Sequence, residues 1–84
     1  MSYQDLERRV VIVLAKAKGL LPSQSFEEAR DYIEHSECEL ALDTIAATLA
    51  AAGVRVDRDL YAEFVFLGNE MEMDEGNWTD IRPS

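Results

Sequence analysis

His35, Cys38 and Glu39 are the residues of this chain whose types and spacing come closest to a chemical site. On a helix, Cys38 and Glu39 would share a face with His35, three and four residues after it. Structural zinc sites use paired cysteines or histidines, and this chain has one of each. A catalytic Cys38 would also need a separate base and an orienting group, which neighbours on one helix rarely supply. We therefore expect no bound metal, no catalytic residue and a polar junction between two helices here.

Other catalytic and cofactor motifs are absent. Asp57-Arg58-Asp59 resembles the start of a calcium loop, but Ala62 and Gly68 occupy the positions that need a glycine and a glutamate. The four glycines stand singly, so no phosphate-binding loop is predicted. The Asp-Ser-Leu tripeptide that carries the cofactor of acyl carrier proteins does not occur. The sequence predicts a protein without cofactors that binds a partner and is not an enzyme.

Acidic charge is the strongest compositional feature. The 84 residues include 17 acids and 8 bases, for a net charge of −9. From Glu27 to Asp43 seven carboxylates stand against Arg30 alone, and from Glu63 to Asp80 six stand against no base, so each run carries −6. The first eighteen residues carry +2. This distribution repels nucleic acid and anionic membranes and favours a basic protein partner. The alternative for either run is a solvated face that maintains solubility.

Apolar residues recur every three or four positions in four segments, which predicts helices near residues 3–18, 25–35, 37–52 and 58–72. The run from Val10 to Val13 is β-branched, so a buried strand stays open for the first segment. Ser25 with Glu28 predicts a capping box at the start of the second helix. Gly53 predicts the end of the third helix, and Asp57 the N-cap of the fourth.

The helical spacing also predicts which side chains form the core. Gly19 would end the first helix, and the stripe of apolar core residues on that helix begins at Tyr3. On the third helix the corresponding apolar stripe extends to Ala52. Trp78 and Ile81 are apolar enough to tie the segment 74–84 back onto the helices. We expect one all-α domain over residues 1–84, a small four-helix bundle with a short C-terminal tail packed back by Trp78.

Localisation follows from what the chain lacks. One cysteine forms no internal disulfide, the first nine residues lack the features of a secretory signal, and the longest apolar run, Val10 to Ala15, is too short to span a bilayer. We expect a soluble cytoplasmic protein.

The stretch from His35 to Asp43, with Glu-Leu-Ala-Leu after an acidic helix start, resembles MafI-type immunity proteins of bacterial polymorphic toxin and contact-dependent inhibition systems. The resemblance covers about Ser25 to Ile81 and continues through Leu49, Val54-Arg55-Val56, Tyr61, Phe64, a late methionine (Met71 or Met73) and Trp78. Cys38 departs from the pattern, which has a small or polar residue there.

The resemblance implies a cytoplasmic antitoxin that binds one cognate toxin domain, often a nuclease with a basic cleft. We expect contact through one of two acidic patches, the first made of Glu34, Glu37, Glu39 and Asp43, the second of Glu70, Glu72, Asp74 and Glu75. Two other classes stay open. One is a structural or regulatory domain that forms homodimers through Val11 and Ile12, and the other is a small metal-binding protein that uses His35 and Cys38.

Overall fold

The computed structural model describes residues 1–83, which form four α-helices: α1 (Tyr3–Ala17), α2 (Ser23–Glu34), α3 (Cys38–Ala52) and α4 (Arg58–Glu70). Two short 3₁₀ turns and two short strands complete this part of the chain: η1 (Lys18–Leu20), β1 (Arg55–Val56), η2 (Glu75–Asn77) and β2 (Arg82–Pro83). The predicted all-α four-helix bundle is confirmed, and the first segment is a helix and not a strand.

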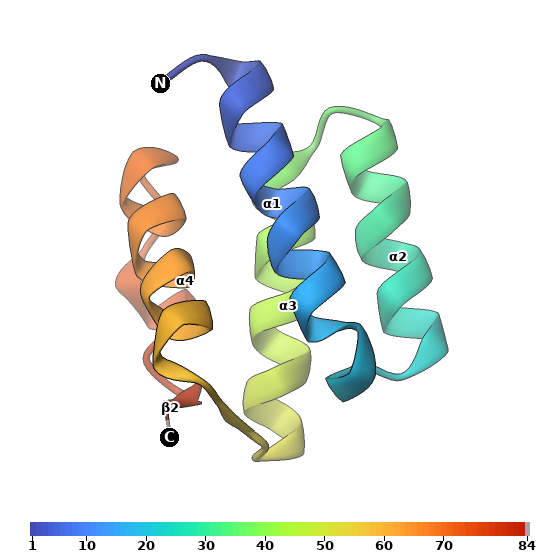
Figure 1. Ribbon diagram of the computed structural model, residues 1–84, viewed down its shortest axis with the longest axis vertical. Helices are drawn as coiled ribbons and strands as arrows, with labels where there is room; N and C mark the ends of the chain where they lie inside the picture. The colour runs from blue at the N-terminus through green and yellow to red at the C-terminus, as the bar shows by residue number, and fades with distance from the viewer. Residues whose placement is uncertain (84) are drawn as a thin grey trace.

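The helices pack around α1 and α3. Figure 1 shows α1 in front of α3, with α2 on one side and α4 on the other. α1 contacts each of the other three helices. α2 packs closely on α3, and a tight turn joins these two helices. The N-terminal end of α3 and the C-terminal end of α4 consequently lie at the same end of the bundle (Figure 1).

Three helix boundaries show how local chemistry shapes the chain. Gly53 ends α3 with a left-handed φ of 66°, a conformation that favours glycine. The Asp57 carboxylate caps α4 by accepting the N–H of Leu60 at 2.7 Å. Both were predicted. The Ser2 hydroxyl caps α1 by accepting the N–H of Asp5 at 3.2 Å.

Two predicted boundaries are wrong. The capping box of Ser25 and Glu28 does not form, because α2 begins two residues earlier, directly after Pro22. Proline suits that position, since it has no N–H to leave unpaired and its φ is already helical. Gly19 does not end α1, which stops at Ala17 and tightens into the turn η1 that contains this glycine.

The core draws on all four helices, and its largest fully buried side chains include Leu42, Ile45 and Phe64. Two residues assigned to it from the sequence lie outside. Tyr3, the first residue of α1, is 46% exposed, and Ala52, the last residue of α3, is also exposed. Both stand at helix ends, where the apolar spacing continues but the neighbouring helices no longer cover it.

The C-terminal tail closes the bundle over α4, as predicted. Trp78 is 5% exposed and Ile81 2%. The Trp78 ring lies against the backbone of Gly68, so close that a Cβ there would be 2.0 Å from its Cζ3 atom. The tail then pairs in parallel with the α3–α4 connection, Arg82 opposite Arg55 in register. Within residues 1–83, no helix is long and apolar enough to cross a membrane.

Candidate protein-binding groove

The two acidic runs that the sequence leaves as alternatives meet in one groove. It consists of three adjoining hollows along α3, bounded by α1 and the end of α4 at the first hollow and by the chain that follows α4 at the other two. Glu39 and Leu40 line both the first and the third hollow, and Asp43 lines both the third and the second. We call this feature the acidic groove.

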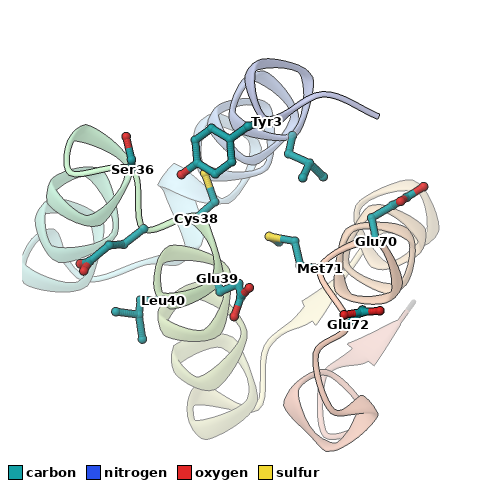
Figure 2. Close-up of a pocket in the computed structure, with 10 residues that line it drawn as sticks. Tyr3, Ser36, Cys38, Glu39, Leu40, Glu70, Met71 and Glu72 are labelled. Carbon is teal, nitrogen blue, oxygen red and sulfur yellow. The ribbon is translucent and has the colours of Figure 1, made fainter.

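The first hollow has a volume of about 470 Å³ and lies where α1, α3 and α4 converge. Its walls come from the start of α1, the α2–α3 turn with the start of α3, and the end of α4: Tyr3, Leu6, Ser36, Glu37, Cys38, Glu39, Leu40, Glu70, Met71 and Glu72. Figure 2 shows Tyr3 above Cys38, and Met71 pointing toward them from the end of α4. The hollow thus combines apolar side chains with carboxylates from both runs.

The other two hollows extend the groove along α3. One, of about 320 Å³, is lined by Glu39, Leu40, Asp43, Met73 and Asp74. The next, of about 440 Å³, is lined by Asp43, Ala47, Ala50, Ala51, Gly76 and Asp80. None of the three hollows is lined by a lysine or arginine of the described chain. The groove is therefore negative along its whole length, with small or flexible apolar side chains among the carboxylates.

The structure brings together most of the predicted contact residues. The groove is lined by Glu37, Glu39, Asp43, Glu70, Glu72 and Asp74. Glu34, at the end of α2, and Glu75, in η2, are exposed but line none of the hollows. The predicted contact residues did not include Asp80 or the apolar side chains of the groove. The sequence does contain a signal for Leu40, because a large apolar residue outside the core stripe of α3 is expected at the surface. Leu40 is 46% exposed.

Two strained backbone positions border the first hollow. Ser36 (φ 60°) and Glu72 (φ 56°) are the non-glycine residues of the described chain with positive φ. A left-handed conformation costs a non-glycine residue on the order of 1 kcal/mol or more. Ser36 turns the chain from α2 into α3, and Glu72 turns it from α4 toward the tail, so these two turns bring the acidic runs together.

Tyr3 supplies a neutral phenol to the groove. Hydrogen bonding with the Cys38 side chain raises the pKa of Tyr3 above its usual value of 10.0. A tyrosine hydroxyl is protonated at physiological pH even at the usual pKa, so Tyr3 can donate a hydrogen bond. Cys38 itself is buried, with 2% of its surface exposed.

His35 lies at the junction between α2 and α3, as expected, and the helical face that would bring it together with Cys38 and Glu39 does not form. The chain turns between α2 and α3, so that Cys38 points into the core while His35 remains exposed at the end of α2. The His35 Nδ1 donates to the Asp31 carbonyl at 2.8 Å, and this bond, with the nearby Asp31 carboxylate, raises the pKa of His35 above 6.5. Within residues 1–83, no group of three or more His, Cys, Asp and Glu side chains could hold a metal ion.

Glu63, the first acid of the second run, serves the fold instead of the groove. Its carboxylate accepts hydrogen bonds from Arg9 at 3.1 and 2.5 Å, and the Arg9 guanidinium lies 4.1 Å from the Phe66 ring centre. The bond to Glu63 raises the pKa of Arg9. These contacts join α1 to α4 on their common side.

The chain was compared with protein-family models, characterised proteins and solved structures, and none of them matches. The likeness to MafI-type immunity proteins thus remains a resemblance in sequence pattern. The chemical capacity of the groove follows from its lining. Carboxylates bind lysine and arginine side chains, while Tyr3, Leu40 and the methionines offer apolar contact between them.

Proposed function

We propose that the protein is an immunity protein that binds a basic toxin domain in the acidic groove and neutralises it without catalysis. The observation that carries this proposal is the convergence of both acidic runs on one groove that no basic side chain of the described residues lines. Bringing like charges together is unfavourable, and a basic partner relieves that repulsion. A merely solvated surface has no need for such crowding.

The groove's two kinds of side chain suit two stages of binding. Its carboxylates attract a basic partner over a distance and speed the encounter. The apolar side chains of the groove then offer surface that a partner can bury. Tyrosine is enriched among the residues that dominate binding energy, and methionine adapts its shape to the partner. Tyr3, Leu40 and Met71 are exposed or half-buried in the free protein and so are available for this contact.

The expected occupant is a segment that carries lysine or arginine beside apolar residues. Nuclease toxins, which the resemblance implies, bind nucleic acid through basic clefts. A carboxylate-lined groove competes for the same positive charges that otherwise hold phosphates. Neutralisation by occupation of the cleft requires tight binding but no catalytic residue on the immunity protein.

Toxin protection tests this function. Cells that express the toxin encoded beside this gene are supplied with wild type, with a groove variant or with a control variant. The groove variant, Glu39→Lys/Glu72→Lys, reverses one carboxylate from each run at the first hollow. The control, Glu27→Lys/Glu28→Lys, reverses two exposed carboxylates near the start of α2, at the other end of the bundle (Figure 1). Each variant changes the net charge from −9 by the same four units.

We expect survival with wild type and with the control, and death with the groove variant, at equal levels of folded protein. Circular dichroism and thermal unfolding of both variants verify the fold. Glu27 pairs with Arg30 on the surface, and exposed pairs of this kind contribute little to stability. Equal protection by the two variants would show that the groove is only a solvated face.

A further inference from the structure

The outer face of α1 carries apolar side chains that no other part of the described chain covers. Val11 is 46% exposed and Ile12 50%, and Ala15 is exposed one turn further on. The opposite face of α1 is fully committed to the core through Val10, Val13, Leu14 and Ala17. Two adjacent large β-branched residues, both half-exposed, form a small apolar centre in the middle of the helix.

Charged side chains flank this centre in an ordered way. Arg8 is exposed and lies on the face itself, three and four residues before Val11 and Ile12. Asp5 lies toward the start of α1 and Lys16 toward its end, and both are exposed. They are eleven residues apart, which is about three helical turns, so they lie on the same flank of the helix. With a rise of 1.5 Å per residue, Asp5 is about 10 Å and Lys16 about 7 Å from the midpoint between Val11 and Ile12.

We infer that a second copy of this chain covers this face, through an antiparallel contact between the two α1 helices. A two-fold axis near Val11 and Ile12 places Asp5 of each copy beside Lys16 of the other. The remaining axial offset of about 3 Å is within the reach of a flexible lysine. The face is therefore complementary to itself in its apolar centre and in the pairing of Asp5 with Lys16.

The overall charge distribution is compatible with this face. Two copies of a chain with net charge −9 repel each other, most strongly where their carboxylates gather. The first eighteen residues carry only +2, so copies that approach through α1 avoid a contact between their acidic runs. The acidic groove stays open in this arrangement, because Tyr3 and Leu6 line it from the start of α1 while α3 and α4 form the rest. The dimer would thus present two grooves.

A single pair of helices of this length buries less surface than a standard interface of about 800 Å² per partner. The dimer is accordingly concentration-dependent. Sedimentation equilibrium of the purified protein, from micromolar to millimolar concentration, measures the dissociation constant without any toxin. The result is independent of the proposed function, since it concerns only this chain.

Charge reversal on one flank tests the pairing. Asp5→Lys or Lys16→Asp alone puts like charges together at two symmetric positions, and each should weaken the dimer by about tenfold or more. The double variant Asp5→Lys/Lys16→Asp restores opposite charges, keeps the net charge of −9 and should recover wild-type dimerisation. A wild type that stays monomeric at millimolar concentration, or single variants that dimerise as wild type does, would overturn the inference.

Disulfide formation gives a second measurement that does not depend on these reversals. Ile12→Cys places a thiol next to the proposed axis, whereas the native Cys38 is buried. Under a mild oxidant, we expect Ile12→Cys to form a cross-linked dimer. The control Gln24→Cys, at an exposed site on α2, should remain uncross-linked at the same concentration. Equal cross-linking of the two would contradict an axis on α1.

Discussion

Gly68 is the position where one added methyl group should disturb the fold most specifically. It lies on α4 under the Trp78 ring, and a Cβ would stand 2.0, 2.5 and 2.7 Å from three carbons of that ring. These distances are far below ordinary contact, so Gly68→Ala forces Trp78 to move. Trp78 is the only tryptophan and holds the tail that follows α4.

The cost can be bounded from the structure. A buried aromatic side chain removes about 150–250 Å² from water, so complete displacement of Trp78 would cost about 4–6 kcal/mol. A ring that shifts without leaving costs about 1–3 kcal/mol in overpacking. Alanine is better than glycine inside a helix by about 1 kcal/mol, which offsets part of either cost. We predict a net loss of about 0–2 kcal/mol if the ring shifts and about 3–5 kcal/mol if it is displaced completely.

Denaturant unfolding monitored by tryptophan fluorescence measures both effects in one experiment. Gly68→Ala should lower the unfolding midpoint and shift the emission of the folded protein to longer wavelength, because Trp78 meets water. Gly19→Ala is the matched control, since no atom lies within 4 Å of a Cβ there. A Gly68→Ala protein with unchanged emission and wild-type stability would refute the packing of the tail on α4.

Three further outcomes are expected. Phe64→Ala should cost about 3–5 kcal/mol in equilibrium unfolding, since Phe64 is fully buried, and a loss below about 0.5 kcal/mol would place it at the surface. Glu72→Gly should stabilise the protein by about 1 kcal/mol by relieving the positive φ, while weakening toxin binding through the lost carboxylate; lower stability in the same unfolding assay would contradict the strain. His35 should titrate above pH 6.5 by NMR because of its hydrogen bond to the Asp31 carbonyl. The contribution of this bond to stability, complete below pH 6.5, should be lost as the pH rises through the raised pKa of His35. A folded-state pKa at or below 6.5 would contradict the bond.

Local signals predicted most of the fold. Gly53 and Asp57 mark their boundaries correctly because an αL stop and a side-chain cap depend only on neighbouring residues. The apolar spacing located all four helices among residues 1–83 for the same reason. The helix start predicted at Ser25 is wrong because two start signals lie within four residues of each other. The helix begins directly after Pro22, and the capping box does not form.

The groove could be predicted only in part. Residue types and charge runs identify Glu39 and Glu72 as candidates, but their approach depends on how α3 and α4 pack and on two left-handed turns. Serine and glutamate at such turns give no sequence signal, since glycine or asparagine is the usual residue there. Tyr3 was assigned to the core because helical periodicity does not reveal where a bundle ends.

The association rate constant with the purified toxin domain tests the acidic groove most directly. Opposite charges steer the encounter over a range that salt shortens to about 8 Å at physiological ionic strength. We predict that the on-rates of wild type and of Glu27→Lys/Glu28→Lys fall steeply from low to physiological salt. The variant Glu39→Lys/Glu72→Lys should bind much more slowly at low salt, and its on-rate should depend less on salt. On-rates that are the same for the two variants at every salt concentration would contradict binding in the groove.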